Sequence, residues 1–268
     1  MQSLAERQEL YKSSYDPDIM RRLPIIINID GRSFSKLTKN LSKPYSTHLS
    51  KVMADAMLYT ITEIQGSVFG FTFADEVSII IRNDQSFETE PWLNNKIQQI
   101  ASSAASIFTL AFYKFAFALD LEAELIGDPV FKAHVWAVPT LSEASNYIIY
   151  RQQECYKSAI RLASIHEISK KIGQKKAFDL IQGRTVEEKL DMLLKYVGIN
   201  FHEYYPSYFY NGTAAYRSPM LVENADETFA RNKWTVNSSV PYFLNNKDFL
   251  FNILLNGKDI IRVTDDDK

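Results

Sequence analysis

Two acidic residues in the first third of the chain lie where a divalent cation could bind. Asp30 follows a continuous apolar run at residues 24–29, and Asp75 lies in a short turn between two further apolar runs, at 67–73 and 77–82. Carboxylates that are close together raise each other's pKa, so a pair of them persists mainly where a cation lies between them. Carboxylate oxygens at strand ends suit Mg²⁺, which keeps several waters and bridges substrate phosphates.

Two such ions about 4 Å apart could activate an attacking oxygen and neutralise the leaving group of a phosphoryl transfer. Gly31 fits this interpretation, because a residue without a side chain lets the backbone approach a metal or a phosphate. Glu76 would point away from Asp75 if a strand begins there. An ordinary acidic turn explains the same residues, since Asp-Gly is a common turn dipeptide. The pattern by itself leaves both interpretations open.

The surrounding pattern predicts the elements that position these residues. We expect strands over residues 24–30, 67–73, 77–82 and 129–138, and helices over 47–64 and 92–117. The order strand, helix, strand, strand, helix, strand is the split βαβ arrangement of a ferredoxin-like sheet. In such a sheet the end of the first strand lies beside the central hairpin. Asp30 and Asp75 are therefore predicted to meet at one edge.

The second half of the chain is predicted to be mainly helical. We expect helices over 142–164, 167–182 and 185–197, followed by weaker strand-like segments near 214–222 and 234–243. The predicted fold class is α+β: a βαββαβ sheet with helices on one face, followed by a helical C-terminal part. The expected division is 1–140 for the catalytic part and 141–268 for the C-terminal part, packed together as one unit.

Composition places the chain among globular proteins. It has 268 residues, of which 46% are hydrophobic and 23% charged, and a formal net charge of −2. These values exclude a disordered chain, and the single cysteine, Cys155, excludes an intrachain disulfide and a thiolate zinc site. The longest apolar runs stop short of about 18 residues, so no membrane association is expected. Residues 20–60 carry seven Lys or Arg against two Asp, which could steer an anion to one site.

Three motifs surround the two aspartates: DGRSF at residues 30–34, KP at 43–44 and FADEVS at 73–78. NY at 146–147, RQ at 151–152, GINF at 198–201 and GT at 212–213 follow in order. Together these motifs resemble those of the tRNA-His guanylyltransferase family and its bacterial and viral relatives, the 3′–5′ RNA polymerases. The resemblance runs from about residue 10 to residue 216.

The resemblance implies a polymerase-like palm and 3′–5′ nucleotide addition. The 5′-monophosphate of a tRNA would be activated with ATP or GTP, after which the 3′-hydroxyl of a nucleotide attacks and pyrophosphate leaves. The implied cofactor is Mg²⁺, as two ions, with Asp30, the Gly31 carbonyl and Asp75 as ligands. Asp30 and Asp75 are thereby the implied catalytic residues.

The resemblance also implies nucleotide-binding residues and partners. The nucleotide-binding set is Gly31, Arg32, Ser33, Phe34, Lys43 and Lys96. The set expected to contact the acceptor end of the RNA is Arg151, Gln152, Lys157 and Lys189. The implied partners are tRNA and nucleoside triphosphates, with no membrane. A homo-tetramer in the cytoplasm is expected.

Several positions depart from the family pattern. Asn28 replaces a frequent Arg, Lys132 and His134 replace an Asp and an Arg, and Glu154 and Ser158 replace an Asp and an Asn. The stretch 156–159 lacks the HxxN pattern of eukaryotic-type members and is closer to relatives that repair 5′-truncated tRNAs. An aromatic Tyr156 could stack on a base without selecting it. Templated repair of several tRNAs is therefore expected in preference to tRNA-His-specific guanylation.

Two other functions are compatible with parts of the sequence. A nucleotide cyclase would share the sheet and the two carboxylates, but the chain has no Gly-Gly-Asp/Glu hairpin signature. A catalytically drifted RNA-binding or regulatory protein would explain the departures. The intact set of Asp30, Gly31 and Asp75 argues against it, because unused paired carboxylates gain nothing from their repulsion.

Overall fold

Four strands from the first half of the chain form the centre of the sheet in the computed structural model, which describes residues 2–86, 88–223 and 228–257. They are β1 (Ile25–Gly31), β2 (Ser67–Phe73), β3 (Glu76–Ile81) and β4 (Phe131–Ala137). They lie in the order β4-β1-β3-β2 and pair antiparallel. Helix α3 (Thr47–Glu63) follows β1, and α4 (Ile97–Ala118) follows β3. The predicted α+β class and split βαβ order are confirmed.

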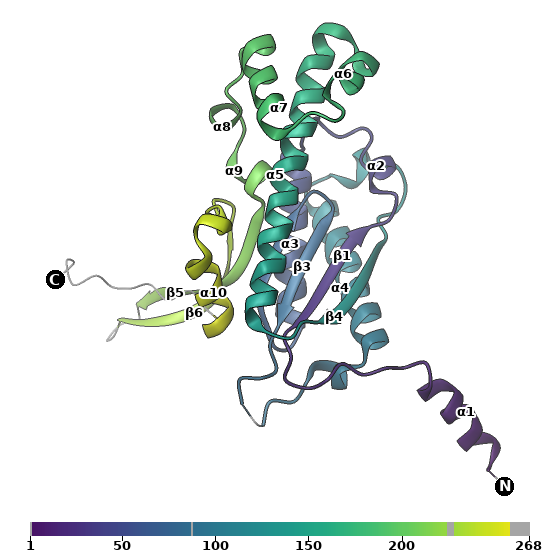
Figure 1. Ribbon diagram of the computed structural model, residues 1–268. Coiled ribbons are helices and arrows are strands. Elements are labelled where there is room, and N and C mark those ends of the chain that lie inside the picture. Colours follow the sequence, from purple (N-terminus) through teal and green to yellow (C-terminus); the bar gives the residue numbers. More distant parts are fainter. Residues whose placement is uncertain (1, 87, 224–227, 258–268) are drawn as a thin grey trace.

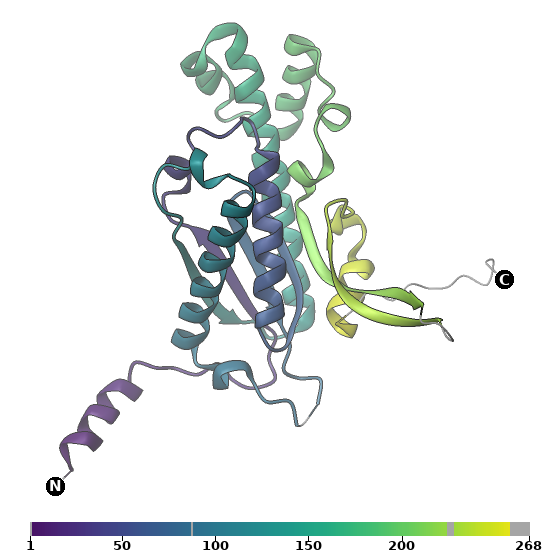
Figure 2. The same cartoon turned by 180° about the vertical axis from the view of Figure 1, so that it is seen from behind.

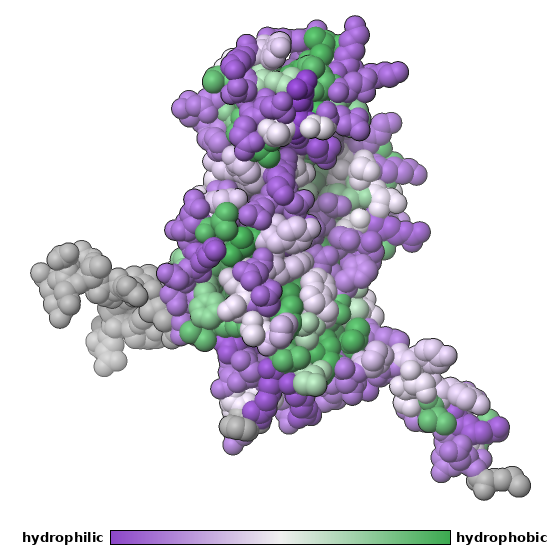
Figure 3. Space-filling view, in the orientation of Figure 1, coloured by the Kyte–Doolittle hydropathy of each residue, from purple (hydrophilic) through white to green (hydrophobic). Residues whose placement is uncertain are grey.

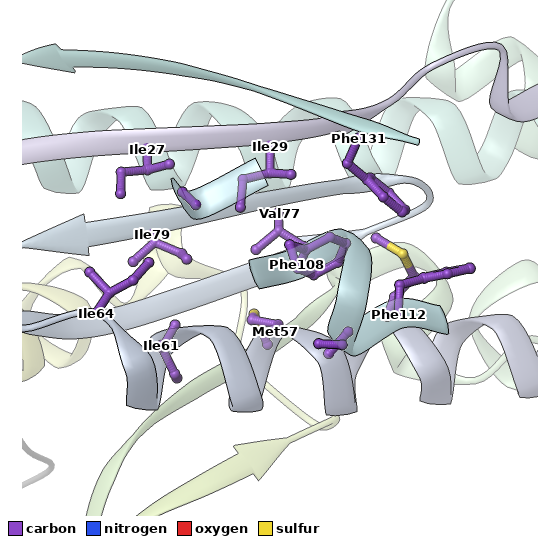
Figure 4. Packing of buried hydrophobic residues seen from close by; sticks show 14 of the residues in the cluster. Ile27, Ile29, Met57, Ile61, Ile64, Val77, Ile79, Phe108, Phe112 and Phe131 are labelled. Carbon is purple, nitrogen blue, oxygen red and sulfur yellow. The ribbon is translucent and has the colours of Figure 1, made fainter. Parts of the chain in front are cut away.

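Helices α3 and α4 cover one face of the sheet, as Figure 2 shows. Successive residues of a strand point to opposite faces, so every second residue of β1 and β3 faces these helices. Ile27, Ile29 and Val77 are fully buried there, against Met57 of α3 and Phe108 of α4 (Figure 4). Residues 25–27 of β1 are buried on both faces, which explains why the strand begins as a continuous apolar run rather than an alternating one.

The opposite face is also covered, contrary to the expectation of helices on one face only. Ile26 and Ile80 point to this side and pack with residues of α5 (Leu141–Ile172) and α10 (Lys247–Asn256). Figures 1 and 2 show α5 on the side of the sheet opposite to α3 and α4. The catalytic part and the C-terminal part therefore share a core.

Helix α5 is continuous where two helices were expected. The prediction of a break between residues 164 and 167 is wrong, because Ser164 and Glu167 lie buried on the same helix. No Gly or Pro falls between residues 141 and 172 to interrupt the helix. The helix ends at Gly173, whose φ of +84° favours glycine.

The C-terminal part is not purely helical, because two of its strands extend the sheet. β5 (Thr213–Glu223) pairs with β2, and β6 (Thr228–Asn237) pairs with β5. Figure 1 shows the β5–β6 hairpin projecting to one side of the body. The expectation of a helical C-terminal part is therefore corrected: the weak strand signal near 214–222 corresponds to β5. The signal near 234–243 covers only the end of β6, since residues 238–243 are not in a strand.

The remaining elements are short. Helices α6 (Gln174–Ile181), α7 (Val186–Met192), α8 (Phe201–Tyr204) and α9 (Ser207–Asn211) follow α5. A π-helical turn spans Leu193–Val197, α2 spans Phe34–Leu37, and 3₁₀ turns span Trp92–Asn95, Glu122–Glu124 and Phe243–Asn245. Helix α1 (Leu4–Ser13) projects from the body and buries no residue (Figure 1). The face in Figure 3 is mainly hydrophilic, with several hydrophobic patches in its lower half.

Helix α4 is long and apolar enough to cross a membrane by length and composition. Its apolar runs are nevertheless interrupted by Gln, Ser, Thr and Lys residues. Its inner side packs in the core, where Ile100, Phe108 and Phe112 have no exposed surface. The core packing accounts for the composition of this side of the helix.

Candidate active site

The end of β1 and the β2–β3 turn bring three carboxylates to one end of the sheet. Asp30 and Glu76 are directly opposed partners in the β1–β3 ladder, and opposed residues share a face of the sheet. The Gly31 N–H donates to the Asp75 carbonyl at 3.2 Å, which holds the turn beside the strand end. The structure thus brings Asp30 and Asp75 together and adds Glu76 to the group.

Of the three carboxylates, Asp75 is the one whose negative charge has no cationic side chain beside it. Burial raises its pKa, a hydrogen bond to its own backbone lowers it, and the neighbouring charges of Asp30 and Glu76 raise it. No Lys or Arg side chain forms an ion pair with Asp75 in the described part of the chain. The folded chain therefore favours a cation, or a proton, at this carboxylate.

The other two carboxylates have partners. Arg151 Nη2 lies 2.5 Å from Glu76 Oε2, and Asn28 Nδ2 donates to Glu76 Oε1 at 2.8 Å. Asp30 Oδ1 is buried and accepts no hydrogen bond, although Lys132 Nζ lies 3.3 Å away. A buried oxygen without a hydrogen bond is costly, and a cation bound at Oδ1 would remove that cost.

These residues fit a divalent cation of the Mg²⁺ type. The described residues contain no cluster of three or more His, Cys, Asp and Glu arranged to hold a metal. The available ligands are thus the oxygens of Asp30 and Asp75 with waters or backbone carbonyls, a donor set that suits Mg²⁺. The unbonded Asp30 oxygen and the uncompensated Asp75 are the observations that support the fit.

Gly31 is required by packing. A Cβ at this position would lie 2.4 Å from the Phe34 ring, so any side chain would displace that ring. Phe34 is itself 7% exposed and packs on Phe112 and Phe131. The motif residues between them, Arg32 and Ser33, are exposed at the same end of the sheet.

A cleft of about 370 Å³ opens beside Asp75. Its lining comes from the loop at 42–46, the start of α3, the β2–β3 turn and the middle of α5. Lys43 lines it and donates from Nζ to the Thr38 carbonyl at 3.1 Å. Phe34 contributes to the wall nearest the sheet. The predicted residues Phe34, Lys43 and Asp75 are therefore brought to one cavity.

An aromatic wall closes another side of the cleft. The Tyr45 ring lies 4.8 Å from the Phe209 ring at an interplanar angle of 30°, and it contacts Tyr205 and Tyr208 edge-on. Tyr45, Tyr208 and Phe209 all line the cavity. Rings beside a cationic side chain such as Lys43 suit a nucleotide, whose base is flat and whose phosphates are anionic.

Arg161 is a cleft residue that the sequence did not single out. It lines the cavity from α5, is exposed, and forms no ion pair in the described part of the chain. Residues three apart share a helix face, so its spacing from Ser158 was the signal available in the sequence. Ser158 lines the same cavity.

Lys96 does not belong to this site. It lies at the opposite end of the sheet, because its neighbour Asn95 bonds to Asn83, just past the end of β3, whereas Asp30 pairs with the first residue of β3. Its Nζ lies 2.6 Å from Asp18 Oδ1 and donates to the Asp16 carbonyl. The prediction of Lys96 as a phosphate ligand is therefore wrong; this lysine ties the N-terminal segment to α4.

Gln152 is also a structural residue. It has no exposed surface; its Nε2 donates to the carbonyls of Asn211 and Pro241, and its Oε1 accepts from the Phe243 N–H at 2.6 Å. A side chain without exposed surface cannot contact an RNA end, so that prediction is corrected. Arg151 forms an ion pair with Glu76, and its side chain is largely buried.

The other acceptor-end candidates remain accessible. Lys157 is exposed and lies 3.0 Å from Glu154, and Lys189 is half-buried in the first helix after α6. Tyr156 was expected to stack on a base, but its ring already stacks on His202, and its hydroxyl lies 3.0 Å from His202 Nε2. Cys155 is 2% exposed, as expected for a small buried hydrophobe, and burial raises the pKa of its thiol.

Comparison with known proteins identifies the chain. The family model described as tRNAHis guanylyltransferase matches residues 7–139, which include Asp30, Lys43 and Asp75. The chain belongs to this family. A probable tRNA(His) guanylyltransferase of Dictyostelium discoideum is 25% identical over 233 residues, covering 85% of this chain and 88% of the relative. The tRNA(His) guanylyltransferase of Schizosaccharomyces pombe is 25% identical over 200 residues, covering 73% and 74%.

Solved structures of tRNA(His) guanylyltransferases and similar proteins share the fold. A bacterial tRNA(His) guanylyltransferase-like protein in complex with ATP superposes with a TM-score of 0.80 at 23% identity, covering 94% of this chain and 99% of that protein. The tRNA(His) guanylyltransferase of Saccharomyces cerevisiae superposes with a TM-score of 0.67 at 19% identity, covering 82% and 94%. The palm fold and the nucleotidyltransferase class are thereby confirmed.

Proposed function

We propose that this chain adds nucleotides to the 5′ end of tRNA in the 3′–5′ direction, with Asp30 and Asp75 as the residues that hold the catalytic cations. The observation that carries the proposal is that Asp75 lines a cleft that also contains Lys43 and an aromatic wall, with Asp30 at the adjoining end of β1. The family match and the tRNA(His) guanylyltransferase relatives support the RNA substrate.

Bound Mg²⁺ would supply charge neutralisation of the phosphates and a more acidic attacking hydroxyl. The chain's own residues do the rest of the positioning. Asp30 and Asp75 provide anionic oxygens on adjoining elements, and the Gly31–Asp75 hydrogen bond keeps those elements in register. Arg151 and Asn28 hold Glu76, so that this third carboxylate is already compensated.

The cleft suits the nucleoside triphosphate. Lys43 and Arg161 would contact the phosphates as cations, and the Tyr45–Phe209 pair would lie against the base. Phosphoryl transfer requires mainly positioning and charge neutralisation from the protein. ATP or GTP is the proposed substrate at this cleft, in agreement with the nucleotide-bound bacterial structures of the same fold.

A nucleotide-incorporation assay tests the proposal. The wild type is incubated with Mg²⁺, ATP, labelled GTP and a 5′-truncated tRNA, and compared with Asp75→Asn. Asp179→Asn removes one negative charge from an exposed position on α6 and is the matched control. We expect incorporation by the wild type and the control and its loss in Asp75→Asn. Equal incorporation by all three would contradict the proposed role of the carboxylates.

The RNA specificity is tested with the same reaction. We propose templated repair of several tRNAs, on the resemblance at residues 156–159, and offer all four nucleotides on tRNA-His and on a truncated tRNA of another identity. Fill-in that follows the opposite strand on both RNAs is the expected result. Selective addition of G to tRNA-His, without fill-in on the other RNA, would contradict it.

A drifted RNA-binding protein is the alternative. It predicts tRNA binding without incorporation, and unchanged tRNA binding in Asp75→Asn. The tetrameric assembly and the cytoplasmic location remain predictions, which sedimentation and cell imaging test respectively.

A further inference from the structure

Lys132 lies directly opposite the proposed cation-binding residue Asp30. The two are Cα partners in the antiparallel β1–β4 ladder, so the ladder register places them together on one face of the sheet. Lys132 Nζ lies 3.3 Å from Asp30 Oδ1. The lysine side chain is 59% exposed and the aspartate side chain 32%, so the pair lies at the solvent boundary.

The pair is held by charge and not by a directed hydrogen bond. Asp30 Oδ1, the oxygen nearest the ammonium, is buried and accepts no hydrogen bond. Lys132 forms no second ion pair within the described residues. An ammonium on a long, mostly exposed stem can leave such a position at little energetic cost.

Asp30 therefore lies between a cation and a carboxylate in one cross-strand row. Lys132 of β4 is on one side and Glu76 of β3 is on the other. Glu76 is already compensated by Arg151 and Asn28. Lys132 is thus the only ammonium or guanidinium within ion-pair distance of Asp30 in the part of the chain that the structure describes.

A divalent cation at Asp30 would meet this ammonium. Like charges within a few ångströms repel, and the repulsion is stronger at a partly buried oxygen than in bulk water. We propose that Lys132 competes with the divalent cation for the Asp30 carboxylate and so lowers the affinity of the site for that cation. This inference rests on the proposed function, because it assumes that Asp30 binds the metal.

The competition has a consequence for the state of the site without metal. The ammonium compensates Asp30, and the arginine compensates Glu76, which leaves the uncompensated charge on Asp75. Divalent cation binding then requires the departure of Lys132 from Asp30 as well as the loss of metal-bound water.

A direct metal titration tests the inference without reference to activity. Mn²⁺ is added to the metal-free protein, and free Mn²⁺ is measured by electron paramagnetic resonance. Lys132→Met keeps the length of the side chain and removes the charge. The matched control is Lys175→Met on α6, which removes the same charge from an exposed lysine that forms no ion pair within the described chain.

We expect the Mn²⁺ dissociation constant of Lys132→Met to be about two- to fivefold lower than that of Lys175→Met, the scale expected for removing a partly exposed ion pair. The difference should vanish when both variants also carry Asp30→Asn. Thermal denaturation in metal-free buffer establishes that each variant is folded before titration.

The possible failures are distinguishable. If Asp30→Asn weakens Mn²⁺ binding while Lys132→Met and Lys175→Met bind equally, the competition is wrong and the metal role of Asp30 stands. If Asp30→Asn binds Mn²⁺ as the wild type does, the proposed metal site is wrong, and the competition is wrong with it. Weaker binding in Lys132→Met would also overturn the inference, since it would make the lysine a supporting residue.

Discussion

Arg151 of α5 lies 2.5 Å from Glu76 at the start of β3, and its guanidinium lies 5.3 Å above the Phe73 ring. This pair connects the long helix of the C-terminal part to the hairpin that carries Asp75. Both side chains are largely buried, at 17% and 16% exposure. Because Arg151 compensates Glu76, the carboxylates left for a cation are Asp75, and Asp30 when Lys132 moves away from it.

The first prediction concerns this pair. Arg151→Met should lower the free energy of unfolding by about 2–4 kcal/mol, because it leaves a buried carboxylate without its partner. Urea denaturation measures the change. The double variant Arg151→Met with Glu76→Gln should recover most of the loss, because no unpaired charge then remains. Equal losses in the single and double variants would show that the arginine acts through packing alone.

The second prediction concerns Asp75 and pH. Burial raises its pKa in the folded chain above the ordinary value of an aspartate. An acid with a raised folded pKa favours folding below its unfolded pKa, and this contribution is lost as the pH rises through the folded value. In metal-free buffer at pH 7, Asp75→Asn should therefore melt about 1–3 °C above the wild type, a shift corresponding to less than about 1 kcal/mol in a chain of this size.

That advantage should shrink as the pH falls through the folded pKa of Asp75, where the wild-type carboxylate becomes protonated. Added Mg²⁺ should raise the melting temperature of the wild type more than that of Asp75→Asn, because a ligand stabilises the state that binds it. Asp179→Asn, an exposed change on α6, is the control and should match the wild type in both measurements. A constant difference between Asp75→Asn and the wild type from pH 3 to pH 8 would contradict the assignment.

The third prediction separates two lysines. Lys43→Ala should weaken nucleotide binding by about 1–3 kcal/mol, the range for a hydrogen bond to a charged group. Lys96→Ala should leave nucleotide affinity unchanged, because this side chain lies beyond the other end of the sheet, bound to Asp16 and Asp18. Calorimetric titration with ATP measures both. A loss of affinity in Lys96→Ala equal to that in Lys43→Ala would overturn this placement.

The fourth prediction concerns Gln152. Gln152→Leu removes three hydrogen bonds to backbone groups and leaves the buried Phe243 N–H without an acceptor. The expected loss is about 2–4 kcal/mol of unfolding free energy. Gln153→Leu is the control, since its side chain forms none of these bonds. If Gln152 contacted the RNA instead, Gln152→Leu would weaken tRNA binding at unchanged stability.

Local sequence determined the palm and the carboxylate pair. The largely apolar run before Asp30 predicts a strand buried on both faces, and the two runs on either side of the short turn at Asp75 predict a hairpin. The strand–helix order then allows one sheet in which these ends meet, and β1 and β3 do pair there. Secondary-structure periodicity and chain connectivity carry this information without reference to distant contacts.

Tertiary structure decided which other polar residues belong to the site. Lys96 has a side chain of the type that binds phosphate. It lies at the far end of the sheet, however, because it directly precedes the first residue of the long helix α4. Gln152 bonds to residues 59 to 91 positions away, and Lys132 meets Asp30 only through the β1–β4 register. Such pairings depend on how helices pack and strands align, and no local pattern encodes these contacts between residues distant in the chain.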